Sequence, residues 1–265
     1  MKVYFGADSV QPLEFEKILS YVAPFEGKVG IEMQTHFHVG GFEEKLQACM
    51  PELKKYPIGC HSPYYESEYS AKKGTPEYEK SIELLTKTLQ YVKDLDAKYM
   101  VFHHNNHAFE NKESTLRNAR ENFFTIQEIC EDAGIPLVVE NAGIMAHNNM
   151  LLNQEEFIEE CKMLPCNVLI DIGHAHANHW DLAYVMEALK DKIVAYHIHN
   201  NDGIHDSHKR VFDGTLDFHK FLEDWHRLTP DANLILEYCK ETAVDVDGAI
   251  EDIRYVLEYV EKNQQ

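Results

Sequence analysis

The sequence predicts a single (β/α)8 barrel that spans residues 1–265. Short apolar runs alternate with longer amphipathic segments from one end of the chain to the other, which is the pattern of parallel βα units. Eight such units follow one another, and no linker or low-complexity segment divides them. A chain of 265 residues, 44% of them hydrophobic, is long enough for one large core, although the length alone would also suit two small domains.

The expected strands are short apolar runs bounded by turn residues or charges. A strand that is apolar on both faces belongs in a parallel sheet covered by helices, as the barrel requires. In chain order, the eight runs are Val3–Ser9, Lys28–Thr35, Pro57–Pro63, Tyr99–His104, Pro136–Asn141, Val168–His176, Ile193–Asn200 and Asn233–Tyr238.

The expected helices carry boundary signals and helical periodicity. Pro12 and Pro76 suit the first turns of two helices, and Gly134 suits the end of another. The apolar residues between Ile82 and Val92 recur at helical spacing. The polar segment Asn201–Gly214 is expected to be a loop. In chain order, the helices are Pro12–Phe25, Gly41–Lys55, Pro76–Leu95, Glu113–Ala133, Gln154–Met163, Leu182–Leu189, Phe218–Leu228 and Val246–Val260.

The sixth strand ends in a carboxylate. Its even positions from Val168 to Ile172 are all apolar and point to one side, while Leu169 and Asp171 point to the other. A carboxylate at the end of a buried strand is costly unless it is paired or binds a metal ion. The alternative interpretation is that Asp171 only caps the following helix.

A His, Asp or Glu closes each strand from the third to the eighth. On the fifth strand, alternation turns Val138 and Glu140 inward, while Leu137 and Val139 face the helices. Because the carboxyl ends of the strands build the active site in this fold, the six side chains are expected to meet at one rim. They are His61, His103, Glu140, Asp171, His199 and Glu237.

Six metal-ligand side chains in register predict a divalent metal site. A single inward His is more often a core residue than a ligand, but crowded carboxylates without cations would repel one another and lose hydration. The mixture of imidazole and carboxylate favours Zn, Mn, Fe or Co over Ca. The loop after the seventh strand adds Asp206 and His208, which could hold an ion together with His174. The alternative for that loop is an ordinary solvated segment.

The histidines that stand close together in the sequence are separated by alternation. The outward apolar Met100 and Phe102 favour His103 over His104 as the inward residue. His197 and His199 share a face, and His199 lies nearer the rim. The remaining histidines are assigned to the surface or to helices: His36, His38, His107, His147, His179, His205, His219 and His226.

The composition of the chain limits the kinds of partner and the cellular compartment that we expect. The formal net charge of −20 disfavours a nucleic-acid partner, since neutralising phosphates requires a basic face. Six cysteines without CxxC spacing indicate reduced thiols in a cytoplasmic protein. The N-terminal stretch meets a charge too early for a signal peptide, and no apolar run reaches membrane-spanning length. A homo-oligomer is left open.

This ligand set, with the motifs Asp171-Ile-Gly-His174, His199-Asn-Asn-Asp202 and Asp206-Ser-His208, resembles the xylose isomerase-like TIM-barrel superfamily. That group includes sugar isomerases and epimerases, inosose dehydratases and the endonuclease IV enzymes. In the epimerase branch, the resemblance implies one divalent ion held by the residues matching Glu140, Asp171, His199 and Glu237. In the endonuclease branch, it implies three zinc ions held by nine residues: His61, His103, Glu140, Asp171, His174, His199, Asp206, His208 and Glu237.

The resemblance favours a metal-dependent sugar isomerase or epimerase with a dehydratase as a variant. A divalent ion would bind the carbonyl and a neighbouring hydroxyl and stabilise an enediolate, while Glu140 and Glu237 move the proton. The late loops lack a Gly-rich phosphate cradle, which favours an unphosphorylated keto-sugar or polyol. Candidate contacts to substrate hydroxyls are Tyr64, His104, Asn141, His176 and Lys209.

Two other functions stay open. An endonuclease IV-like multi-zinc phosphoester hydrolase could use the same ligands. The acidic chain lacks a basic groove, however, and has His104-Asn105-Asn106 where that branch has a Pro-Gly turn. The other alternative is a non-catalytic, metal-binding barrel subunit. The number of ions, from one to three, separates the isomerase from the hydrolase.

Overall fold

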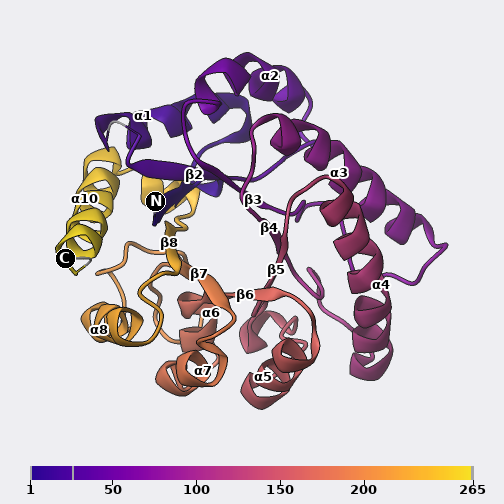
Figure 1. The fold of residues 1–265 in the computed structure, drawn as a ribbon. Helices are drawn as coiled ribbons and strands as arrows, with labels where there is room; N and C mark the ends of the chain where they lie inside the picture. The colour runs from indigo at the N-terminus through magenta and orange to yellow at the C-terminus, as the bar shows by residue number, and fades with distance from the viewer. Residues whose placement is uncertain (1, 26, 264–265) are drawn as a thin grey trace.

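The computed structural model describes residues 2–25 and 27–263, and these form a closed barrel of eight parallel strands in sequence order. The first strand pairs with the second and with the eighth, so the sheet has no free edge. Figure 1 shows the helices as an outer ring around the strands. The strands are β1 (Val3–Gly6), β2 (Val29–Met33), β3 (Ile58–His61), β4 (Met100–Phe102), β5 (Leu137–Glu140), β6 (Asn167–Asp171), β7 (Ile193–Ile198) and β8 (Asn233–Leu236).

The helices follow the predicted order, with local differences. Three helices have the predicted bounds, and the others differ by a few residues, apart from the first. The segment Pro12–Phe25 is instead broken into 3-10 turns around α1, because Glu14 has non-helical dihedral angles and Pro24 cannot donate a backbone hydrogen bond. The helices are α1 (Ile18–Val22), α2 (Phe42–Leu53), α3 (Pro76–Asp94), α4 (Lys112–Asp132), α5 (Gln154–Met163), α6 (Ile172–Ala177), α7 (Leu182–Leu189), α8 (Phe218–Leu228), α9 (Lys240–Ala243) and α10 (Val246–Asn263).

Two short helices were not predicted. The sixth strand ends at Asp171, and α6 begins at the next residue, so His174 and His176 are helical rather than extended. The helix α9 follows the eighth strand and places Lys240 and Glu241 at the rim. Both helices are shorter than two turns and follow a strand directly, so neither leaves a periodic pattern that the sequence alone would show.

The core is divided by the alternation of the strands. Outward residues such as Val168 and Ile170 pack with the helices in the larger apolar cluster. A separate inner cluster fills the barrel and consists of Tyr4, Tyr99, Val101, Val138, Leu169, Ala195 and Ile235. Because Leu169 and Val138 belong to this inner cluster, Asp171 and Glu140, two positions further along, face into the barrel at its carboxyl end.

The segments at that end are short strands followed by structured loops. The strands stop earlier than predicted, so His103, His199 and Glu237 lie just beyond β4, β7 and β8. The predicted loop Asn201–Gly214 is tied to the barrel, since Asn200 pairs with Lys209 in an antiparallel bridge. Within the described part of the chain, no helix is both long and apolar enough to cross a membrane.

Candidate metal centre

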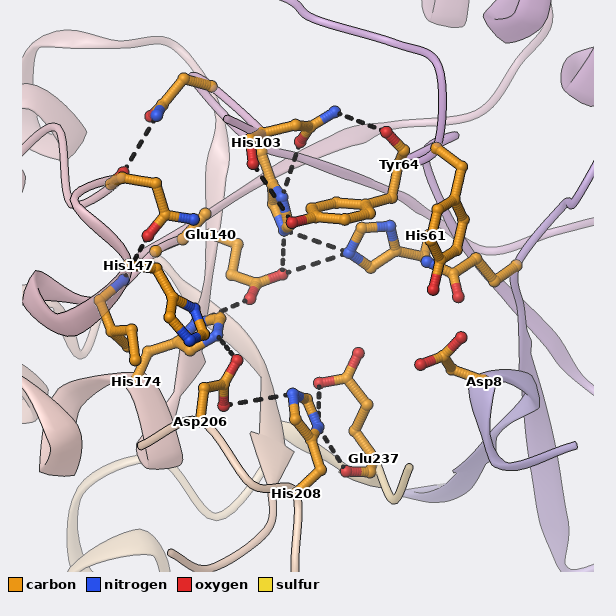
Figure 2. A pocket seen from close by; sticks show the side chains of 18 residues that line it. Asp8, His61, Tyr64, His103, Glu140, His147, His174, Asp206, His208 and Glu237 are labelled. Atoms are coloured by element: carbon orange, nitrogen blue, oxygen red, sulfur yellow. Dashed lines mark hydrogen bonds and ion pairs between the residues drawn. The ribbon is translucent and has the colours of Figure 1, made fainter. Parts of the chain in front are cut away.

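A cavity of about 180 Å³ opens at the carboxyl end of the barrel (Figure 2). Seven of the nine predicted metal ligands line it: His61, His103, Glu140, His174, Asp206, His208 and Glu237. The other two, Asp171 and His199, are fully buried directly behind this wall. The structure therefore brings the nine side chains together.

His61, His103 and Glu140 converge on one point from three neighbouring strands. The Nε2 atoms of the two histidines are 3.1 Å apart, and that of His103 is 3.0 Å from Glu140 Oε2. Each Nδ1 faces an acceptor, the carbonyl oxygen of Ser62 at 2.7 Å or Asn106 Oδ1 at 3.1 Å. Each Nδ1 therefore carries the proton, and both Nε2 lone pairs point toward a carboxylate. Only a cation or a shared proton makes that arrangement favourable.

Asp171 has two roles. Its Oδ1 accepts a hydrogen bond of 2.7 Å from the backbone N–H of His174 and so caps α6. Its Oδ2 lies 3.1 Å from Nε2 of His199. Asn141 fixes the backbone of Asp171, since Oδ1 of the amide accepts from its N–H and Nδ2 donates to its carbonyl. The capping and ligand interpretations are therefore compatible, because each uses a different oxygen atom.

The loop after β7 completes a third group of candidate metal ligands. Asp206 Oδ2 lies 3.1 Å from Nε2 of His174, and Asp206 Oδ1 lies 3.2 Å from Nε2 of His208. His208 donates from Nδ1 to the carbonyl oxygen of Glu237 at 2.9 Å, which orients its Nε2 toward Asp206. This is the arrangement in which a backbone carbonyl sets the tautomer of a metal-binding histidine.

A layer below the rim contains two residues that the sequence interpretation did not select. His197 Nε2 is 2.7 Å from Glu32 Oε1, and Tyr99 donates to Glu32 Oε2 at 2.7 Å. The other nitrogen of His197 lies 3.4 Å from Glu140 and 3.3 Å from Glu237. A charged residue in the run Val-Gly-Ile-Glu-Met of β2 is the signal that could have identified Glu32.

The groups of the centre shift one another's protonation. Burial raises the pKa of Glu140, but the imidazoles of His103 and His197 outweigh it and hold that pKa well below its usual range. Burial, opposed by His197 and His208, raises the pKa of Glu237 to about 8. Burial and then the neighbouring His103 lower the pKa of His61 to about 4. The pKa values of the two glutamates in this cavity are therefore shifted in opposite directions, downward for Glu140 and upward for Glu237.

The donor set fits a divalent cation. Four buried atoms make no hydrogen bond of good geometry among the described residues: His174 Nδ1, His197 Nδ1, His199 Nδ1 and Asp206 Oδ1. Three of them lie 3.2–3.4 Å from a carboxylate or an imidazole instead, and the exception is His199 Nδ1. Five triads have ligand atoms within 4.8 Å of one another: His61–His103–Glu140, His174–Asp206–His208, His199–His208–Glu237, Glu32–His197–Glu237 and Glu140–Asp171–His174. Buried imidazoles and carboxylates that crowd together in this way with poor hydrogen-bond geometry are typical of a cation site.

The five residues predicted to contact the substrate do not lie together in one cavity, unlike the predicted metal ligands. Tyr64 lines the cavity and donates to the carbonyl oxygen of Asn106. His104 is turned outward, with Nε2 3.6 Å from Glu160 of α5. His176 pairs with Thr215 at 2.8 Å on another face, and Lys209 is exposed in the loop bridge. The fifth residue, Asn141, is occupied by the backbone of β6.

Of the histidines assigned to the surface or to helices, two lie at the site. His147 is exposed in a 3-10 turn, as assigned, but it also lines the cavity, whereas His36 is buried at the rim with 4% exposure rather than at the surface. Asp8, just beyond β1, also lines the cavity. These three side chains come from loops or 3-10 turns, where the strand alternation that located the other ligands does not apply.

The comparisons with known proteins agree with this architecture. The sequence profile of the family described as xylose isomerase-like TIM barrel matches residues 26–260. The chain belongs to this family. An uncharacterized protein of Methanocaldococcus jannaschii, MJ1614, is 25% identical over 181 residues, which cover 67% of this chain and 68% of that protein.

Two solved structures share the whole fold of this family member. A D-tagatose 3-epimerase-like protein superposes with a TM-score of 0.80 at 20% identity, over 100% of this chain and 98% of that one. The IolI protein, solved with a zinc atom bound, superposes with a TM-score of 0.77 at 17% identity, over 99% of each chain. At these identities, the likeness establishes the fold.

Proposed function

We propose that this chain is a divalent-metal-dependent sugar isomerase or epimerase. Such an enzyme removes a proton from a carbon atom beside a carbonyl group and returns a proton to the same or the neighbouring carbon atom. The observation that carries the proposal is the placement of Glu140 and Glu237. Both carboxylates line the central cavity, and both lie against Nδ1 of His197, at 3.4 and 3.3 Å. Two carboxyl groups beside one small cavity supply a base and an acid for proton transfer.

The metal would be held by the buried carboxylates and imidazoles. Glu140, Asp171, His199 and Glu237 form the single-ion set that the epimerase branch implies. When bound, a divalent ion supplies a Lewis acid that polarises the substrate carbonyl. The epimerase-like and zinc-containing structures of the same fold support this assignment.

The side chains of the protein itself perform the proton transfer. An ionised carboxylate removes the proton from the carbon atom, and a second group returns a proton to the same or the neighbouring carbon atom. We assign these roles to Glu140 and Glu237. Tyr64 presents a hydroxyl group at the cavity wall and can contact a substrate hydroxyl. The neutral, hydroxyl-rich substrate that fits this polar cavity is an unphosphorylated keto-sugar or polyol.

Proton exchange provides the direct test. The full-length protein, loaded with Mn²⁺, Co²⁺ or Zn²⁺, is incubated with a panel of ketoses and polyols in heavy water, and deuterium incorporation is followed by NMR. We expect deuterium at a carbon atom beside the carbonyl of at least one sugar. Absence of incorporation across the panel, with metal bound, would overturn the proposal.

A second candidate is a multi-zinc phosphoester hydrolase that acts on a small substrate. One specific observation favours it: the triads His61–His103–Glu140 and His174–Asp206–His208 provide ligands beyond those of a single-ion site. The net charge of −20 argues against duplex DNA as its substrate. Elemental analysis separates the candidates, since one ion per chain supports the isomerase and three support the hydrolase. Efficient nicking of an abasic duplex near physiological salt would reverse our ranking.

A further inference from the structure

A second, larger cavity adjoins the central one at the same rim. It has a volume of about 700 Å³, and Asp8 and Tyr65 line both cavities. The rest of its wall comes from the segments that follow β1, β2 and β8. Small-molecule sites usually have volumes of about 300–1,000 Å³, so the second cavity has the size of a ligand site and the central cavity alone is smaller.

His36 gives this cavity a buried polar group without a partner. The side chain lines the cavity and is 4% exposed, and neither ring nitrogen has a hydrogen-bond partner among the described residues. The nearest carboxylate oxygen, Asp8 Oδ1, is 4.0 Å from Nε2. A neutral imidazole offers one donor and one acceptor, which suits a hydroxyl group. A buried polar group of this kind needs a hydrogen-bond partner, and a hydroxyl group of a molecule in the cavity can provide one.

An aromatic surface lies beside His36. Tyr65 is 42% exposed, and its ring centroid is 4.6 Å from that of His38 and 5.4 Å from that of His36. Exposed aromatic faces next to hydrogen-bonding groups suit amphipathic rings, which present C–H groups on one face and hydroxyl groups at the edge. A pyranose ring has this character.

The charges of the wall disfavour an anionic group on the ligand. Asp8 and Glu241 contribute two carboxylates and Lys240 contributes one ammonium group. A phosphate or carboxylate on the ligand would therefore meet more negative than positive charge. An uncharged polyhydroxy group avoids this repulsion and can pair with all three side chains.

We propose that the second cavity is a subsite for an uncharged glycosyl unit. The preferred substrate is then a keto-sugar joined to a second sugar, with the keto-sugar in the central cavity and the second ring on Tyr65 and beside His36. This inference rests on the proposed function for the identity of the reacting unit. The size, the unpaired His36 and the aromatic surface of the second cavity stand independently of that function.

The test compares ketose disaccharides with a free ketose. Lactulose and palatinose each join a fructose unit to a second hexose, and D-fructose is the reference. With the metal-loaded, full-length protein, we expect kcat/KM for deuterium exchange to be at least about ten-fold higher for one disaccharide than for D-fructose. Leu13→Trp, which fills the second cavity from an exposed position, and His36→Ala should each reduce this ratio toward one. Tyr184→Ala, an exposed aromatic residue on α7, is the matched control and should leave the ratio unchanged.

Saturation-transfer NMR separates this inference from the proposed function. If no sugar exchanges its protons, the proposed function fails. Saturation transfer to the second hexose ring of a disaccharide that is lost in Leu13→Trp would still support the subsite. The inference is overturned if D-fructose is used as well as both disaccharides and neither variant changes the ratio. It is also overturned if neither disaccharide shows saturation transfer to its second ring.

Discussion

His61 and His103 turn their Nε2 atoms toward each other at 3.1 Å. Because each Nδ1 is committed to a carbonyl-type acceptor, two lone pairs meet beside the carboxylate of Glu140. Neutral imidazoles would not adopt this arrangement without a positive charge between them. The pair therefore favours a positive charge at this end of the barrel, either a metal cation or a shared proton.

The first prediction concerns metal content. Purified protein soaked with Zn²⁺ or Mn²⁺ should retain at least one ion per chain after desalting, as measured by elemental analysis. Asp171→Ala and His199→Ala should each reduce that content substantially, because both remove buried ligands at the centre of the set. Replacement of the exposed His219 by Ala is the control. Wild-type protein that retains no metal after soaking would contradict the prediction.

The second prediction separates the two functions of Asp171. Asn keeps an oxygen atom that can cap α6, whereas Ala does not, and loss of an N-cap costs about 1 kcal/mol. With a chelator present throughout, Asp171→Ala should therefore have a lower free energy of unfolding than Asp171→Asn by about that amount. Both variants should bind metal less tightly than the wild type. Equal unfolding free energies for the two variants would show that the cap contributes nothing to stability.

The third prediction concerns the proton-transfer pair. Glu140→Gln and Glu237→Gln keep the side-chain shape and one oxygen atom but remove the base. General acid–base catalysis typically contributes about 10²–10⁴-fold in rate, so each variant should lose about that much turnover while it keeps most of its metal. The measurements are deuterium exchange and elemental analysis on the same samples. A Glu237→Gln protein with bound metal and wild-type turnover would remove Glu237 from the mechanism.

Strand alternation explains how much of the site was predictable. Once Val138 and Leu169 are recognised as inward residues, the positions of Glu140 and Asp171 follow two residues later, because successive strand residues point to opposite sides. The same rule selected His103 over His104, and the structure confirms that His104 turns outward to Glu160. Local periodicity therefore located the inward-facing candidate ligands of the strands.

The side-chain positions of the remaining site residues depend on the geometry of the loops. His36 and Asp8 lie beyond β2 and β1, where the chain leaves the regular strand, so no periodicity indicates where their side chains point. The helix α6 could not be predicted from the sequence for another reason. Its six residues carry too short a pattern to show helical spacing, so the local N-cap that Asp171 provides to the N–H of His174 is its main boundary signal.

The fourth prediction concerns an ion pair outside the cavity, in which the carboxylate is buried and the arginine is exposed. Glu160 of α5 is 1% exposed and accepts hydrogen bonds from Nε of Arg120 on α4, at 2.9 Å to each oxygen. Burial raises the pKa of Glu160, but His104 and Arg120 together lower it to about 2. A carboxyl group whose pKa is depressed in the folded state stabilises the fold above its usual pKa near 4.5, and this stabilisation is lost as the pH falls toward 2.

Glu160→Gln should therefore lower the free energy of unfolding by ~2 kcal/mol at pH 7, since the buried carboxylate loses its charged hydrogen bonds from Arg120. The difference from wild type should narrow as the pH falls from about 4.5 toward 2, because the carboxyl group of Glu160 is then protonated in the unfolded chain while it is still ionised in the folded protein. Urea unfolding at pH 7, 4.5 and 3.5 provides the measurement, and Glu159→Gln on the exposed face of α5 is the matched control. A constant difference across these three pH values would mean that the contribution of Glu160 is packing rather than charge.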